Sequence, residues 1–270
     1  MIKGEALIRD IDACELKPGQ CAFWWMGQHS FIAKMGPHIL YIDPYLKPSE
    51  RRNVEPMVDV ADFAHATIIV GTHDHADHID RTVWPDITEA TRAPFVVPEM
   101  LIETLSGDLS IPRDRFVGVN DMQTVDYEGL KITGVAAAHE FLDQDEKTGR
   151  YPYLGMVFEA NGCKLYHAGD TVKYEGLETR MIKLAPDVAL LPINGRDAER
   201  LARQCYGNMT YQETVDLAGA IQPKLTVPTH WDMFDNNRED PQLMIDYAKV
   251  KFPSLEVKIP SYGERVVVGG

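Results

Sequence analysis

The feature that most constrains the fold is a short run of metal-ligand residue types at the end of an apolar segment. Residues 73–80 read HDHADHID, so three histidines and three aspartates fall within eight positions, directly after the apolar run at 67–71. A strand would place His73, His75 and Asp77 on one side, because its side chains alternate with a period of two, and a turn would bring in His78. Buried without a cation, such a cluster is costly, since its acids are desolvated and its histidines unpaired.

The residue types in this run favour a metal site over a solvated polar loop. Imidazole nitrogens and carboxylate oxygens suit zinc, manganese or iron. A lone H-x-H pair is weak evidence, but the full H-x-H-x-D-H pattern after an apolar strand supplies ligands for two metals. We therefore expect a binuclear centre here.

Further ligand candidates follow other apolar runs. His139 comes after residues 132–138, Asp170 after 165–169 and His230 after 225–229. Each stands where a strand stops and a loop begins, the usual place for site residues on a rigid scaffold. Taken singly, either histidine is more often an ordinary polar residue, and Asp170 alone would serve as a helix cap. Together with the first cluster, they indicate one site.

Hydrophobic patterning predicts an α/β fold. Short apolar runs rich in β-branched and aromatic residues predict strands at residues 21–26, 31–35, 38–43, 67–71, 95–97, 130–135, 153–159, 164–167, 188–192, 225–228 and 255–259. Thr210 and Glu213 form a capping box before one helix, and Asp240 with Pro241 begins another. We expect a single domain spanning residues 1–270, with two mixed sheets packed together and helices outside.

Composition narrows the class of partner. The chain has 27 basic and 41 acidic residues, a net charge of −14, which disfavours nucleic acid and anionic membranes. It has no apolar run long enough to span a membrane and no signal-peptide pattern at the N-terminus. The four cysteines are far apart and fit reduced thiols. We therefore expect a cytoplasmic protein with a small-molecule substrate; assembly into a homo-oligomer stays open.

The order of these motifs resembles the metallo-β-lactamase superfamily of binuclear hydrolases. The likeness includes the Ile42-Asp43-Pro44 strand end and the Gly169-Asp170 pair, and it runs from Trp24 to Trp231. Within the superfamily, the chain is most similar to the L-ascorbate-6-phosphate lactonase (UlaG-like) branch, on the motifs FWWMG at 23–27, THDH at 72–75, LYHAGD at 165–170, NMT at 208–210 and PTHWD at 228–232.

The resemblance implies a fold and a ligand set. The fold would be a four-layer αββα sandwich. One metal would be held by His73, His75 and His139, the other by Asp77, His78 and His230, with Asp170 bridging the two. Asp43 would lie behind the ligands and orient an imidazole by hydrogen bonding. His167 would be either such a supporting residue or a core histidine, and we favour the core.

The resemblance also implies a reaction. Two divalent ions, Zn²⁺ or Mn²⁺ with iron as a further candidate, would bridge a hydroxide that attacks the substrate. Asp77 or Asp170 would briefly accept a proton. A lactonase acting on a small sugar-derived or phosphorylated compound is the preferred function. A phosphodiesterase acting on a small cyclic or lipid phosphodiester is the alternative, since the same centre would serve both.

The substrate side rests on the segment at residues 194–208, which carries three arginines within eight positions. Arginine suits planar recognition of phosphate or carboxylate, so an anionic substrate is one option. A solvated helical turn with local ion pairs explains the segment equally well. From this segment and its surroundings, the expected substrate-binding residues are Asn194, Arg196, Arg203, Tyr206 and Trp231.

Three other functional classes are weighed against this one. Nucleases that process tRNA are disfavoured by the acidic charge. Flavodiiron redox proteins resemble H-x-E-x-D, whereas this chain has His75 and no flavodoxin-like domain. A binding protein with a dead site is disfavoured because all seven expected ligands are present.

Overall fold

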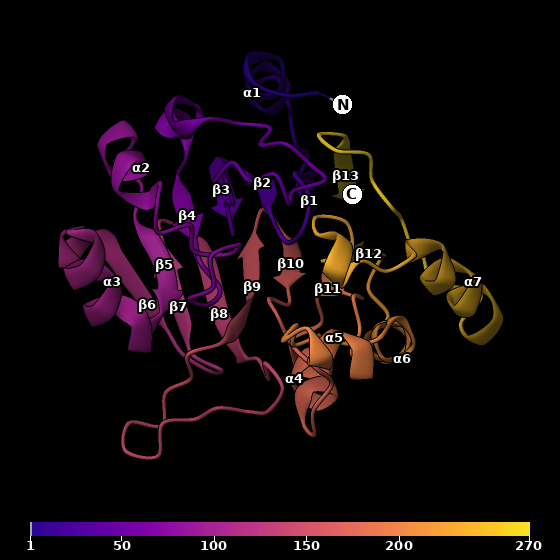
Figure 1. Cartoon of the computed structure of the whole chain (residues 1–270). Coiled ribbons are helices and arrows are strands. Elements are labelled where there is room, and N and C mark those ends of the chain that lie inside the picture. The colour runs from indigo at the N-terminus through magenta and orange to yellow at the C-terminus, as the bar shows by residue number, and fades with distance from the viewer. Residues whose placement is uncertain (1) are drawn as a thin grey trace.

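Two β-sheets face each other at the centre of the protein, and helices lie outside both (Figure 1). The computed structural model describes residues 2–270, so Met1, the first residue of the expected domain, lies outside the described part. The layers follow the order αββα. The prediction of an α/β fold with two mixed sheets flanked by helices is confirmed.

The first sheet holds seven strands in the order β13-β1-β2-β3-β4-β5-β6. From β13 to β3 neighbouring strands are antiparallel, and from β3 to β6 they are parallel. The strands are β1 (Gln20–Trp25), β2 (Phe31–Met35), β3 (His38–Ile42), β4 (Ile68–Val70), β5 (Phe95–Pro98), β6 (Phe116–Val119) and β13 (Arg265–Gly269).

The second sheet holds six strands in the order β12-β11-β10-β9-β8-β7. Strands β12, β11 and β10 are parallel, and the remaining pairs are antiparallel. The strands are β7 (Thr124–Tyr127), β8 (Leu130–Ala136), β9 (Leu154–Ala160), β10 (Cys163–His167), β11 (Val188–Pro192) and β12 (Leu225–Thr229).

Helices cover the outer face of each sheet. The α-helices are α1 (Glu5–Asp12), α2 (Trp84–Ala90), α3 (Ile102–Leu109), α4 (Leu177–Leu184), α5 (Ala198–Ala202), α6 (Tyr211–Ile221) and α7 (Pro241–Lys251). Short 3₁₀ turns lie at Val60–His65, Glu99–Leu101, Arg113–Arg115 and Asp235–Asn237. No helix within residues 2–270 is both long enough and apolar enough to cross a membrane.

The core has an apolar layer between the sheets and one beneath each set of helices. Between the sheets, Phe23 and Phe31 of the first pack with Phe158 and Leu165 of the second. Helices α1, α2 and α3 bury side chains such as Trp84 against the first sheet. Helices α4, α6 and α7 cover the second sheet. Because both faces of the central strands are buried, these strands read as nearly continuous apolar runs, whereas the edge strands β7 and β13 have exposed positions.

Ten of the eleven expected strands are present, and one is wrong. Residues 255–259 form only an isolated bridge, in which Val257 pairs with Thr226 at the edge of β12. Pro253 and Pro260 flank this segment and limit its pairing, since proline offers no backbone donor. The capping-box helix is confirmed as α6, and the helix after Asp240 as α7. Strands β6, β7 and β13 were not expected.

The close approach of a loop to β8 yields a stability prediction. A Cβ added at Gly134 would lie 2.4 Å from the carbonyl oxygen of Asn120, a backbone atom that cannot move without shifting its loop. Gly134→Ala should therefore lower the free energy of unfolding by about 1–3 kcal/mol. Chemical denaturation followed by circular dichroism measures this change.

The matched control is Gly107→Ala on the exposed face of α3, where nothing lies within 4 Å of the added Cβ. Alanine should stabilise that helix by about 0.5–1 kcal/mol. Equal effects of the two substitutions would contradict the packing argument.

Candidate metal centre

The carboxyl ends of several strands from both sheets bring the ligand candidates together. The cluster at 73–78 follows β4, whereas His139, Asp170 and His230 follow β8, β10 and β12. Asp43 directly follows β3, which runs parallel to β4. Parallel neighbours end at the same edge of a sheet, so residues far apart in sequence meet at one edge of the sandwich.

The structure gathers the seven expected ligands into three overlapping groups. In each group one ligand atom per residue lies within 4.8 Å of the others. His73, His75 and His139 form the first group, and Asp77, His78 and His230 form another. These are the two triads that the resemblance assigned to separate metals. The remaining group joins His73 and His78 with Asp170.

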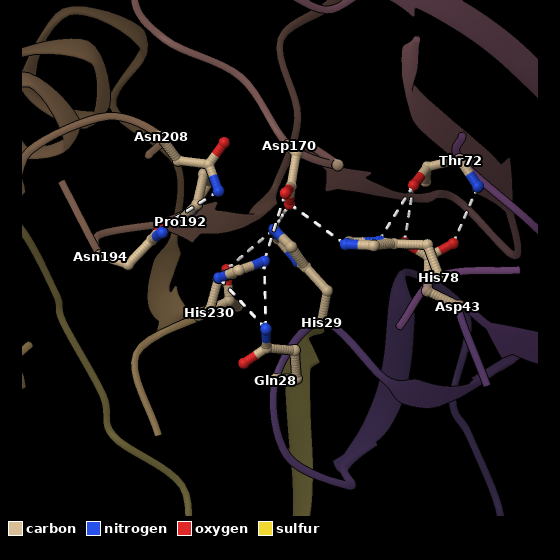
Figure 2. Close-up of polar contacts among 12 residues, drawn as sticks. Gln28, His29, Asp43, Thr72, His78, Asp170, Pro192, Asn194, Asn208 and His230 are labelled. Atoms are coloured by element: carbon tan, nitrogen blue, oxygen red, sulfur yellow. Dashed lines mark hydrogen bonds and ion pairs between the residues drawn. The ribbon is translucent and has the colours of Figure 1, made fainter. Parts of the chain in front are cut away.

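Asp170 lies near imidazoles of both triads. Figure 2 shows its carboxylate beside His78 and His230. Its Oδ2 is 3.2 Å from His230 Nε2 and 3.7 Å from His139 Nε2. Its Oδ1 is 3.3 Å from His78 Nε2. One carboxylate therefore reaches imidazoles of both triads, which is the placement that a bridging ligand requires.

Asp43 orients one of these imidazoles. His78 Nδ1 donates a hydrogen bond to Asp43 Oδ2 at 2.6 Å, which leaves Nε2 directed at the centre. Asp43 also accepts from the backbone N and the hydroxyl of Thr72, at 2.8 and 2.7 Å. A carboxylate behind a ligand histidine fixes both its tautomer and its ring orientation. The side chain of Asp43 is fully buried in this role.

Burial and local charge act in opposite directions on the ligand groups. Burial lowers the pKa of His73 well below its usual value, and it also lowers the pKa of His75, so both are neutral imidazoles. Burial opposes a charge on His78, yet the carboxylates of Asp170, Asp77 and Asp43 raise its pKa well above the usual value. Burial would raise the pKa of Asp170, but His230 and His78 hold it well below the usual range.

These residues fit divalent cations. His78 Nε2 and Asp170 Oδ1 are buried atoms without a hydrogen-bond partner in the described structure, and they point at each other. His73 Nε2 and His75 Nδ1 lie 3.0 Å apart and form a hydrogen bond between two ligand candidates. Excess carboxylate charge and unpartnered nitrogens are costly when buried. A divalent cation would be held by these atoms and would supply the positive charge that the buried carboxylates call for.

Two functional residues were missed by the sequence reasoning, Gln28 and His29, which follow β1. The amide of Gln28 lies 3.0 Å from Asp77 Oδ2 and 3.1 Å from His230 Nε2. His29 is fully buried, with its Nε2 3.7 Å from Asp170 Oδ1 (Figure 2). The only available signal was their position after the FWWMG strand end, where Gly27 turns the chain with φ of 92°.

His167 supports His29 from behind. It is fully buried, and its Nε2 donates to the backbone carbonyl of His29 at 2.8 Å. Its ring lies 4.6 Å from that of His29, centroid to centroid. It is thus a satisfied buried histidine, as favoured from the sequence, that also holds the loop after β1.

Backbone strain gathers at this edge. Gln28, Asp43, Glu140 and His230 all adopt positive φ, between 46° and 74°. Side chains other than glycine rarely take this conformation, which persists only where the surrounding structure imposes it. At Asp43 and His230 the unusual backbone turns the chain at the end of a strand, so that the side chain enters the centre.

A cavity of about 330 Å³ opens over the candidate ligands. Gln28, His75, Asp77, His139, Asp170 and His230 form its floor. Its walls are Arg51, Gln204, Cys205, Tyr206, Phe234, Asn236 and Asn237. Arg51 is the only lysine or arginine among these residues.

The expected substrate-binding residues differ in their position relative to the cavity. Tyr206 lines the cavity. Asn194 is fully buried and donates to Asn237 Oδ1 at 2.9 Å, so it supports the wall from behind. Trp231 packs on Trp25, with ring centroids 5.4 Å apart, and donates its indole N–H to the carbonyl of Pro228.

The two expected arginines bind carboxylates of the protein itself. Both terminal nitrogens of Arg196 lie 2.7 Å from the oxygens of Glu213. Arg203 pairs with Glu199 one helical turn away. The structure brings neither guanidinium into the cavity over the ligands. The Arg203 pair matches the alternative of a turn with local ion pairs, whereas Arg196 pairs with a glutamate of the next helix, α6.

Family and homologue matches agree with this geometry. A model of the β-lactamase superfamily domain matches residues 38–231. A protein of Thermoplasma acidophilum, named a UPF0173 metal-dependent hydrolase, is 29% identical over 81% of this chain and 86% of its own. One from Archaeoglobus fulgidus with the same description is 28% identical over 89% of this chain and 96% of its own.

Solved structures share the fold. A metallo hydrolase from Ignicoccus hospitalis superposes with a TM-score of 0.72 at 23% identity, covering 92% of this chain and 98% of the other. An isothiocyanate hydrolase from Delia radicum gut bacteria superposes with a TM-score of 0.70 at 15% identity, covering 92% of this chain and 100% of the other. The diiron β-hydroxylase CmlA of Streptomyces venezuelae superposes with a TM-score of 0.66 at 13% identity, covering 94% of this chain and 55% of the other.

Two aspartates of the loop after β4 differ in whether they face the other ligand candidates, so substituting each in turn tests which one binds metal. Asp77 belongs to a ligand group, whereas Asp74 turns away and binds the Arg81 guanidinium at 2.8 Å. Asp77→Asn should lower metal affinity by about tenfold or more, because a neutral amide is a weaker ligand than a carboxylate. Elemental analysis after dialysis measures the metal retained.

Asp74→Asn is the control and should keep its full metal content. Thermal melts of both variants check that each is folded. Equal metal loss from the two variants would contradict the assignment of Asp77.

Proposed function

The chain belongs to the β-lactamase superfamily, and from that premise we propose that it is a binuclear metal-dependent hydrolase, with a lactone as the preferred substrate. The observation that carries the proposal is the pair of ligand triads joined by Asp170. The names of its relatives as metal-dependent hydrolases support the hydrolase class.

The chemistry divides between the metals and the side chains around them. When bound, two divalent cations supply an activated water near neutral pH and polarise the scissile carbonyl. The protein contributes neutral imidazoles at His73 and His75 and the anionic Asp170, which together fix where those cations sit. The Gln28 amide lies beside Asp77 at the cavity floor and is placed to orient a substrate oxygen.

Asp77 is the carboxylate better placed to move a proton. Its side chain is 23% exposed and lines the cavity, whereas the side chain of Asp170 is 6% exposed and held between imidazoles. In the proposed ring opening, Asp77 takes the proton of the attacking water and returns it to the leaving alkoxide oxygen. The product is a hydroxy acid.

Metal identity is part of the proposal. Five of the seven ligand candidates are histidines, which favours zinc or iron over manganese. Imidazole nitrogens suit zinc and iron, whereas manganese is better suited by carboxylate oxygens. The di-iron enzyme CmlA shares the fold, which keeps iron among the candidates. We propose Zn²⁺ first, then iron, then Mn²⁺.

The substrate proposed here is small and anionic, of the sugar-derived or phosphorylated type. The cavity of about 330 Å³ suits a small molecule, and Arg51 offers a guanidinium on its wall without an ion pair or side-chain hydrogen bond in the described structure. The alternative is a phosphodiesterase acting on a small cyclic or lipid phosphodiester, which would use the same residues. The closer likeness to the UlaG-like branch and a cytoplasmic location stay predictions from sequence.

Metal removal and substrate panels test the function together. Protein stripped with a chelator should lose all hydrolysis, and adding back Zn²⁺, Fe²⁺ or Mn²⁺ should restore it on lactones, with about two metals bound per chain. Turnover of phosphodiesters alone would favour the alternative reaction. Unchanged activity in the stripped protein would overturn the metal mechanism.

Arg51 gives a sharper test of the anionic substrate. Two lactones that differ only in a ring carboxylate serve as the probe. Arg51→Ala should lower kcat/KM for the carboxylated lactone by about tenfold, since a charge-assisted hydrogen bond is lost, and leave the neutral one nearly unchanged.

Arg203→Ala is the matched control, because Arg203 pairs with Glu199 outside this cavity. Arg203→Ala should leave kcat/KM unchanged for both lactones. If Arg51→Ala affected both lactones equally, an anion-binding role for this residue would be excluded.

A further inference from the structure

A second hollow adjoins the cavity over the metal ligands. Its volume is about 310 Å³, and Glu140, Arg196, Asp197, Leu201, Cys205, Tyr206 and Gly207 line it. Cys205 and Tyr206 line both spaces, so the two lie side by side. We call the second space the Leu201 hollow. It is built by the connection between β11 and α6, which contains α5, together with the first residue after His139.

The charged groups around the Leu201 hollow are largely engaged elsewhere. Arg196 forms its two-pronged contact with Glu213 and also donates to the carbonyl of Asn208 at 3.0 Å. Asp197 caps α5 by accepting from the backbone N of Arg200 at 2.8 Å, and it pairs with the Arg200 side chain. The surface left for a ligand is therefore mainly that of Leu201, Cys205 and Tyr206.

The apolar side chains here are unusually exposed. Leu201 is 58% exposed and Tyr206 is 46% exposed. Phe141 and Leu142, in the adjoining loop after His139, are exposed as well. Contiguous exposed apolar surface beside a site marks ligand or partner binding more often than chance, because leaving it in water costs free energy.

The Leu201 hollow is fixed in place relative to the metal ligands. Asn194 and Thr210 form a bridge across the base of the connection, and Gly195 N donates to the carbonyl of Met209 at 3.0 Å. Met209 N in turn donates to the carbonyl of Thr171, the residue after Asp170, at 2.9 Å. At Gly207 an added Cβ would lie 1.7 Å from the carbonyl oxygen of Gly195, so the chain passes there at close contact.

We propose that the Leu201 hollow binds an apolar substituent, an alkyl or aryl chain, of a substrate whose lactone or ester group lies over the metal ligands. This inference rests on the proposed hydrolase function and adds a substrate class to it. A polar substituent such as a second sugar ring would need several hydrogen-bond partners. Arg196 and Asp197 are already paired, so only the Glu140 side chain and the Tyr206 hydroxyl, which have no hydrogen-bond partner in the described structure, would be left to supply them. An alkyl chain needs only apolar contact.

Binding of carboxylates that resemble the products tests the subsite without turnover. Butanoate, hexanoate and octanoate would be titrated into the metal-loaded protein by calorimetry, with the carboxylate at the metals and the chain directed at the Leu201 hollow. Each added methylene should lower Kd by about three- to fourfold if it is fully buried. A flat series in the wild-type protein would overturn the proposal.

Leu201→Ser supplies the residue-level test, and Ile182→Ser is its control. Ile182 lies on α4, is 54% exposed, and lines neither cavity. Leu201→Ser should leave the Kd of butanoate nearly unchanged and flatten the gain towards octanoate, whereas Ile182→Ser should keep the full slope. A slope that survives Leu201→Ser unaltered counts against the subsite.

Turnover of lactones with increasing alkyl chains separates this inference from the proposed function. If no lactone or ester is hydrolysed but the Kd series keeps its Leu201-dependent slope, the lactonase proposal fails and the subsite stands. If lactones are hydrolysed while binding shows no chain-length dependence, the function stands and the subsite fails.

Discussion

The placement of one buried carboxylate, that of Asp170, between imidazoles from both halves of the fold organises the structure around it. Moving an ionised carboxylate out of water costs several kcal/mol unless opposite charge compensates it. Here His78 and His230 provide that compensation at 3.3 and 3.2 Å, and they come from opposite sheets. The sandwich has to hold both sheets in fixed register for this contact to form, and the divalent cations proposed here would complete the charge balance.

Support for that contact lies one layer further out. Asp43 anchors His78, His167 holds the loop of His29, and unusual backbone conformations turn Asp43 and His230 towards the centre. Such conformations cost about 1–3 kcal/mol each and persist only where neighbouring packing imposes them. The apolar layer between the sheets provides this packing, because it buries the strands that precede each strained residue.

The residues around the substrate cavity are positioned differently from the candidate metal ligands. The ligands are gathered by strand ends, whereas the cavity walls come from connections that carry exposed and unpaired groups. Arg51 and Leu201 lie in such connections, and each offers a ligand something that the protein itself does not use. Arg196, by contrast, is neutralised by Glu213 and mainly holds its loop to α6. In the proposals made here, anionic and apolar recognition would therefore fall to residues without strong partners.

The sequence alone identified the seven ligand candidates and most strands, because H-x-H-x-D-H and the lone residues after apolar runs are local patterns with a chemical meaning. Strands β6, β7 and β13 escaped it, because each is only four or five residues long. Glycine interrupts or ends the apolar runs of β6 and β13, and β7 mixes polar with apolar residues. Only the tertiary structure decided that Gln28 and His29 join the centre, because nothing near them in sequence marks a ligand. It also decided that Arg196 and Arg203 are paired while the Arg51 side chain has no partner within residues 2–270. Charge is visible in a sequence, but whether a charge is already neutralised depends on which side chain folding places opposite it.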